Sequence, residues 1–141
     1  VLKYFLKGPK KGKTEVFIDN LPGFPDGISS NGEDIFWLAI IDPRDKLLDN
    51  ILPFPNLRKI LLLLPEALAP PRPKYGAVFG LNYEGKVIFN FQDPKGQSFS
   101  AVTSVQQFGE SIYLGTLRNP YYGWLTLSNL KKYRKEKGTV K

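Results

Sequence analysis

The stretch LPGFPDGISS, from Leu21 to Ser30, places one carboxylate between two residues that constrain the backbone. Asp26 follows Pro25, whose ring sets one backbone angle, and precedes Gly27, which permits angles that other residues avoid. The two neighbours would therefore aim the Asp26 side chain in a defined direction. Pro-Asp-Gly is also a common turn tripeptide, so these residues by themselves favour an ordinary turn.

Two side chains that carry much of enzyme chemistry are absent from the sequence. Without Cys, the chain has no disulfide, no thiolate zinc site and no Cys nucleophile. Without His, it lacks the commonest general base and the commonest transition-metal ligand. Hard cations bound by oxygen atoms are the metal chemistry that remains easily open.

Other polar and aromatic groups allow two interpretations each. In TLRNPYYGW, 116–124, Arg118 stands beside three aromatic residues and would suit an anion or a ring, but cross-strand packing explains the segment equally well. Phe36 and Trp37 favour packing between sheets over substrate binding. A cluster of acidic residues near the middle of the chain favours charges at a helix N-terminus; its members are Asp42, Asp45 and Asp49.

The composition predicts one globular domain with a basic end. The chain has 141 residues, of which 42% are hydrophobic and 23% are charged. The formal net charge of +7 is concentrated in 131–141, where six Lys or Arg accompany one Glu. No nucleic-acid recognition motif accompanies it, so we expect a solvated basic tail, 130–141, and no nucleic-acid partner. Because the chain begins with Val1 and lacks Met, we infer that residue 1 is not a native start.

Most of the chain predicts short strands separated by Gly, Pro, Asn and Asp, which is typical of an all-β fold. The expected strands are Leu2–Leu6, Glu15–Ile18, Ile35–Ile40, Tyr75–Asn82, Lys86–Phe91, Ala101–Gln106, Ile112–Thr116 and Gly123–Leu127. The exception is 45–68, where Leu and Ile recur at helical spacing and Pro53 and Pro55 interrupt the run. We expect two helices there, with a break. The uninterrupted apolar run is far shorter than the roughly 20 residues of a transmembrane helix.

An internal repeat organises the strands. The motif GEDIF at 32–36 recurs as GESIY at 109–113, which is 77 residues later. Without the 31 residues of 44–74, the offset is 46, close to a propeller blade of roughly 40 to 50 residues. We therefore predict a partial β-propeller of about two to three blades with a helical insert. It would hold two strands of one blade, a complete blade and three strands of another.

Three separated segments, in order, resemble one family. They are YFLKGPKKGKTEVFIDNLPGFPDGI, GAVFGLNYEGKVIFNFQDPKG and SIYLGTLRNPYYGWLTL, and with the insert they resemble the strictosidine synthase-like family over residues 2–127. The family fold is a six-bladed β-propeller related to gluconolactonases and paraoxonases. The resemblance implies that 1–129 is the C-terminal half of such a propeller, with its helical insert at 45–68.

The resemblance also implies roles for individual residues. In the superfamily a divalent cation, usually Ca²⁺, lies on the propeller axis, and Asp26 matches a ligand in the family's Pro-Asp-Asn motif. Gly27 stands where the family has Asn, which removes one amide oxygen. Thr103 matches the glutamate that strictosidine synthase uses, and a threonine cannot replace that acid–base role at neutral pH. Thr103 and Arg118 are expected in the substrate pocket.

The function implied by the resemblance is metal-assisted hydrolysis of an ester or lactone, with a small-molecule substrate, rather than strictosidine synthesis. The alternative is a propeller without catalysis that serves as a binding or membrane-peripheral scaffold. We expect the insert 45–68 to cap the axial pocket or to meet a membrane surface through its apolar stripe. Because a partial propeller exposes edges and faces, we expect the isolated chain to self-associate or to be poorly stable.

Overall fold

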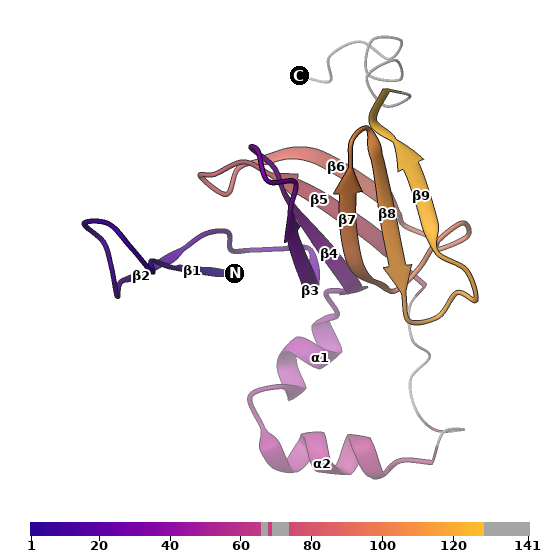
Figure 1. Ribbon diagram of the computed structural model, residues 1–141. Helices are drawn as coiled ribbons and strands as arrows, with labels where there is room; N and C mark the ends of the chain where they lie inside the picture. Colours follow the sequence, from indigo (N-terminus) through magenta and orange to yellow (C-terminus); the bar gives the residue numbers. More distant parts are fainter. Residues whose placement is uncertain (66–67, 69–73, 129–141) are drawn as a thin grey trace, which may run out of the picture.

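The structure is a computed structural model that describes residues 1–65, 68 and 74–128. Within these residues, nine strands form three antiparallel sheets, and two helices leave one end of the second sheet (Figure 1). The basic tail that we expected at 130–141 lies outside the described residues.

The first sheet is a two-stranded hairpin that extends to one side of the others (Figure 1). β1, Leu2–Tyr4, pairs with β2, Thr14–Val16, and Lys3 lies opposite Glu15. Several of its apolar side chains face solvent, among them Leu2 and Tyr4. A hairpin this small buries too little surface to be stable alone, so it depends on its contacts with the rest of the chain.

The second sheet is a four-stranded meander. Its strands are neighbours in chain order: β3, Gly23–Ser30; β4, Phe36–Pro43; β5, Gly76–Leu81; and β6, Val87–Asp93. The turn between β3 and β4 is closed by Asn31, whose Oδ1 accepts hydrogen bonds from the backbone N–H groups of residues 33, 34 and 35. Gly32 follows with a φ of 81°, which suits glycine, so the Asn-Gly pair specifies this turn.

The third sheet repeats this hairpin and adds one strand. It contains β7, Val102–Phe108; β8, Ser111–Thr116; and β9, Gly123–Thr126, again in chain order. Gly109, in the β7–β8 turn, has a φ of 55°. The internal repeat therefore marks the turn between the first two strands in both the second and the third sheet.

The two helices of the insert connect β4 to β5. α1, Lys46–Ile51, begins after Asp45, whose carboxylate accepts hydrogen bonds from the backbone N–H groups of Leu47 and Leu48. α2, Pro55–Leu63, carries a proline at its first position, where no hydrogen-bond donor is needed. The expected pair of helices with a proline-rich break is confirmed.

The core lies on both faces of the second sheet. Because successive strand residues point to opposite faces, Trp37 and Ala39 pack toward the third sheet, while Leu38 and Ile40 pack on the other side with Phe17. The Trp37 side chain is fully buried, with its ring 5.5 Å from that of Phe89. The packing interpretation of Trp37 is therefore confirmed. β5 is buried along its whole length, as expected for a central strand covered on both sides.

The expected strands are confirmed, with ends displaced by at most three residues, and one strand was missed. The sheets contain the predicted two, four and three strands. The missed strand is β3, whose sequence GFPDGISS is rich in residues that usually interrupt strands.

Candidate functional site

The first strands of the second and third sheets, β3 and β7, lie side by side (Figure 1). The Ser29 hydroxyl of β3 donates a hydrogen bond of 2.5 Å to the backbone carbonyl oxygen of Val105 in β7. β7 also contacts β4. The two sheets therefore meet along their first strands, which is the arrangement of sheets that radiate from a common axis.

Both first strands have a register irregularity at corresponding positions. In β3, the pairing with β4 shifts between Pro25 and Ile28, which leaves Asp26 and Gly27 outside the regular ladder. In β7, the pairing with β8 shifts between Val102 and Ser104, at Thr103. Asp26 and Thr103 are 77 residues apart, which is the offset of the internal repeat. Because bulges re-aim side chains and are over-represented next to active sites, this pair of bulges is the main candidate site.

Gly27 allows the two bulges to approach each other. A Cβ atom at this position would lie 2.5 Å from the carbonyl oxygen of Thr103 and 3.3 Å from the Cα atom of Ser104. The φ of Gly27 is not in the left-handed region, so our expectation that it supplies an unusual backbone angle is wrong. Glycine fits here because the neighbouring backbone leaves no room for a side chain.

Asp26 is the fourth residue of β3, and its side chain is exposed. The ordinary turn that Pro-Asp-Gly favoured is therefore wrong, because the segment is an irregular strand held between β4 and β7. Within the described part of the chain, the Asp26 carboxylate makes no hydrogen bond or ion pair. Its oxygen atoms are available to a ligand, and the contact at Gly27 brings its strand against Thr103.

Arg118 reaches the same end of the sheets, but its guanidinium is engaged in an ion pair. It lies in the loop between β8 and β9, and its Nη2 donates a hydrogen bond of 3.1 Å to Oδ1 of Asp42. Asp42 lies opposite Phe24, near the start of β3. The Arg118 side chain is only 23% exposed. This pair ties the third sheet to the second, and the Asp42 carboxylate balances the charge that we expected to face a substrate.

The two other acidic residues near the insert act on local structure. Asp45 caps α1, and Asp49 forms an ion pair of 2.8 Å with Arg44. Among residues 1–65, 68 and 74–128, no group of three or more His, Cys, Asp or Glu side chains is placed to hold a metal ion. Ca²⁺ takes six to eight oxygen ligands, so the single carboxylate of Asp26 does not complete a calcium site.

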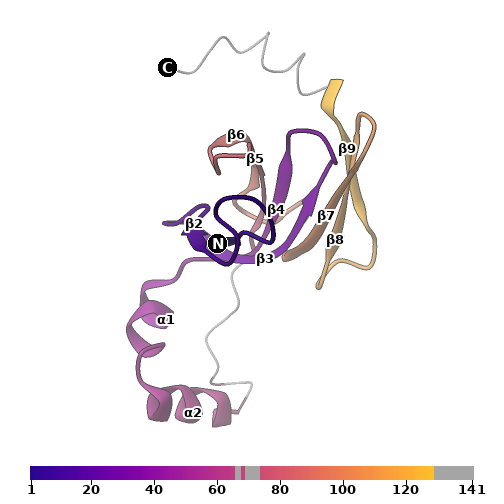
Figure 2. The same ribbon diagram turned by 60° about the vertical axis from the view of Figure 1, so that its left-hand side comes forward.

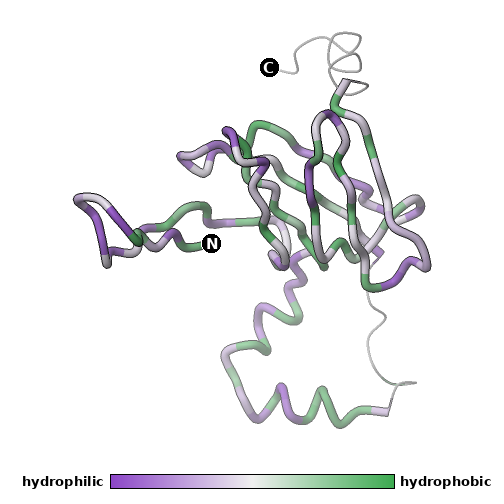
Figure 3. The backbone as a smooth tube through the Cα atoms, in the orientation of Figure 1, coloured by the Kyte–Doolittle hydropathy of each residue, from purple (hydrophilic) through white to green (hydrophobic). Residues whose placement is uncertain are grey.

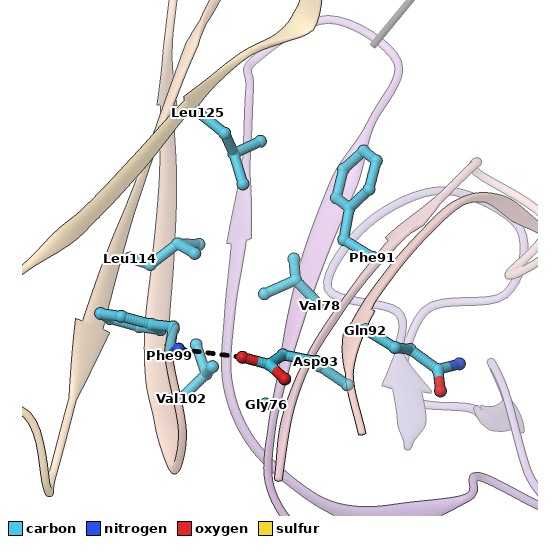
Figure 4. Close-up of a pocket in the computed structure, with 10 residues that line it drawn as sticks. Gly76, Val78, Phe91, Gln92, Asp93, Phe99, Val102, Leu114 and Leu125 are labelled. Carbon is cyan, nitrogen blue, oxygen red and sulfur yellow. Dashed lines mark hydrogen bonds between the residues drawn. The ribbon is translucent and has the colours of Figure 1, made fainter. Parts of the chain in front are cut away.

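An apolar cleft between the second and third sheets lies apart from the three predicted site residues (Figure 4). It has a volume of about 170 Å³, and the side chains of Val78, Phe91, Leu114 and Leu125 face it. At its rim, Asp93 Oδ2 accepts hydrogen bonds from the backbone N–H groups of residues 98 and 99. Burial acts to raise the pKa of Asp93, but these and other backbone hydrogen bonds outweigh it and hold the pKa below its ordinary value.

Comparison with known proteins places the chain in a wider context. It is 30% identical to an adipocyte plasma membrane-associated protein of Bos taurus over 86% of the chain, and 30% identical to that of Danio rerio over 92%. It is 31% identical over 82% of its length to "Protein STRICTOSIDINE SYNTHASE-LIKE 3" of Arabidopsis thaliana. The chain is homologous to part of the strictosidine synthase-like family. It spans about one third of these relatives, 31% to 33% of their length.

The family resemblance found in the sequence is therefore confirmed, while no protein-family model matches the chain. Because the matches extend over most of the chain, they include both sheets that carry the paired bulges and the insert between them. The structure brings the strands of Asp26 and Thr103 together and places Arg118 near the same end. The partner of Arg118, Asp42, was missed as part of this site because 76 residues separate the two.

Proposed function

We propose that this chain is part of a β-propeller hydrolase that acts on ester or lactone bonds and that holds Ca²⁺ in part through Asp26. The pair of bulges on adjacent first strands is the observation that carries the proposal. Three features support the propeller: the sheets follow one another along the chain, two of them meet along their first strands, and the second sheet is covered on both faces.

The chemistry of Asp26 suits one ligand of a hard cation. Its carboxylate is exposed, lies on a first strand and has no partner in the described part of the chain. The relatives are about three times as long as this chain, so a full-length protein has room for the other oxygen ligands. When bound, a divalent cation supplies a Lewis acid that polarises a carbonyl group and stabilises the developing oxyanion.

The other two residues would orient a substrate rather than transfer its protons. The Thr103 hydroxyl can donate and accept a hydrogen bond but does not ionise at neutral pH, so we do not assign strictosidine synthesis to this protein. The Arg118–Asp42 pair fixes the β8–β9 loop against the end of β4. We assign Thr103 and the backbone around Arg118 to the wall of the pocket.

A scaffold without catalysis is the second candidate. The observation that favours it is the chemistry of the bulges, where Asp26 is the only ionisable group and Thr103 stands in place of an acid. Such a protein would keep the propeller and bind a partner without hydrolysing a substrate.

An esterase and lactonase assay on a full-length protein that carries this chain separates the two candidates. The hydrolase predicts activity that a chelator removes and that added Ca²⁺ restores. Asp26→Asn should lower kcat/KM by roughly tenfold or more, since even indirect partners of metal ligands cost that much. Asp19→Asn is the matched control, because Asp19 is also an exposed aspartate but lies before β3. Chelator-insensitive activity, or none on either substrate class, would rule out the hydrolase.

A further inference from the structure

The helix α2 carries the most exposed large apolar side chains of the described residues. Leu62 is 84% exposed and Leu63 is 82% exposed, and Leu57 and Ile60 are also exposed. In Figure 3, the tube along α2 is largely green, the colour of hydrophobic residues. Exposed leucines in this number on one short helix indicate a surface that a partner covers.

The sheets do not cover this helix. Figures 1 and 2, which differ by 60°, both show the two helices extending away from the end of the strands. Among the described residues, α2 packs against α1 and has no substantial contact with a strand. Neither helix contains a buried residue. The cap over the axial pocket that we expected is therefore not formed by α2 within the described part of the chain.

The apolar residues of α2 surround the helix rather than forming one stripe. Successive residues are about 100° apart, so Ile60 and Leu62 project to nearly opposite sides. A protein groove covers one face of a helix, whereas a helix that is apolar all round suits a medium that surrounds it. The acyl boundary of a bilayer is such a medium, and α2 is too short to cross it.

The charges of α2 are also those of a helix that lies on an anionic lipid surface. Its two ionisable residues are Arg58 and Lys59, both exposed, and neither forms an ion pair in the described part of the chain. On the helix surface they flank Leu62, so their long stems can reach phosphate groups while Leu62 enters the lipid. The acidic residues of α1 are not available to oppose this, because Asp45 caps the helix and Asp49 pairs with Arg44.

We propose that α2 is a lipid-docking element that places Leu62 and Leu63 in the acyl boundary of an anionic membrane, with Arg58 and Lys59 on the headgroups. This role is independent of hydrolysis at the bulges. No helix in the described residues is long and apolar enough to cross a membrane, so the contact is peripheral. It would hold the end of the sheets that carries Asp26 and Thr103 toward the lipid surface, because the insert leaves from that end.

Co-sedimentation of the 141-residue chain with vesicles tests the proposal. The vesicles are phosphatidylcholine with or without phosphatidylserine, and the chain should bind the phosphatidylserine vesicles more tightly. Leu62→Ser with Leu63→Ser should weaken binding at least tenfold, on the order of the transfer energy of one buried leucine. The matched control is Leu2→Ser with Leu117→Ser, which are 68% and 67% exposed elsewhere and should bind like the wild type.

A charge experiment separates α2 from the basic tail. Arg58→Gln with Lys59→Gln should weaken binding about 25-fold at low salt, from about fivefold for each basic residue at an anionic surface. Lys7→Gln with Lys11→Gln removes the same charge from the β1–β2 loop and should leave binding unchanged. Equal losses in the two charge variants would show that net charge alone drives binding, which would overturn the proposal.

Two further outcomes would also overturn it. Wild-type chain that binds neither vesicle shows that α2 does not dock on lipid. If the Leu62→Ser, Leu63→Ser variant keeps vesicle binding but loses self-association in sedimentation velocity, the surface is an interface between copies of the chain. A Leu63→Trp variant gives an independent readout, since its emission should shift to the blue on phosphatidylserine vesicles if this residue enters the lipid.

Discussion

Replacing Gly27 tests whether the close approach of β3 and β7 holds the candidate site together. In Gly27→Ala, the new Cβ atom would lie 2.5 Å from the Thr103 carbonyl oxygen, where ordinary contact begins at 3.4 Å. The two strands must therefore separate by about 0.9 Å at the bulges. Overpacking of this kind costs about 1–3 kcal/mol, which is partly offset by up to ~1 kcal/mol because alanine is better than glycine in a strand.

The expected result is a lower melting temperature, followed by circular dichroism. A net loss of about 1–2 kcal/mol corresponds to roughly 4–8 °C for a chain of this size. Thr103→Gly in the same chain should not restore the melting temperature, because the overlap is with the Thr103 backbone rather than its side chain. An unchanged melting temperature in Gly27→Ala, or full rescue by Thr103→Gly, would refute the reasoning.

Two other contacts give sharp expectations for stability. Asp93→Asn should lower the melting temperature at neutral pH. Because the folded pKa of Asp93 is below its ordinary value of about 3.9, its contribution is present above that value and is lost as the pH falls through the folded pKa. Wild type and variant should therefore converge in acid, and a constant difference would contradict this. Gln107→Leu removes the 2.7 Å acceptor of the buried Trp37 indole N–H and should cost about 1–3 kcal/mol in urea unfolding. Gln106→Leu should cost much less, and equal costs would exclude the hydrogen bond as the cause.

Local patterns in the sequence were sufficient for most elements of the fold. Short runs of β-branched and aromatic residues between turn residues predicted eight of the strands, and the prolines at 53 and 55 predicted the break between the helices. The repeated turn motif predicted how the strands divide among the sheets, because the same hairpin begins the second and third sheets.

β3 was missed because its conformation depends on its neighbours. Its glycines, proline and aspartate disfavour a strand locally, yet β4 pairs with it on one side and β7 contacts it on the other. The same segment contains the bulge that carries Asp26. Its irregular composition is therefore a feature of the candidate site rather than of a turn.

The candidate site was predictable only in part. The family resemblance pointed to Asp26 and Thr103, and the offset of 77 residues contained the signal that their positions correspond. The ion pair between Arg118 and Asp42 had no such signal, because only the folded sheets bring the two side chains within 3.1 Å. The reason for Gly27 was also hidden, since it lies in the backbone of a strand far along the chain.

Calorimetric titration of Ca²⁺ into a full-length protein that carries this chain tests the role of Asp26 most directly. Asp26→Asn keeps the shape of the side chain and removes its charge, so it should weaken Ca²⁺ binding by roughly tenfold or more while leaving the fold intact. The 141-residue chain should bind Ca²⁺ weakly or not at all with either residue, because it supplies too few oxygen ligands. Equal Ca²⁺ affinities of the full-length wild type and the Asp26→Asn variant would contradict the assignment of Asp26 as a cation ligand.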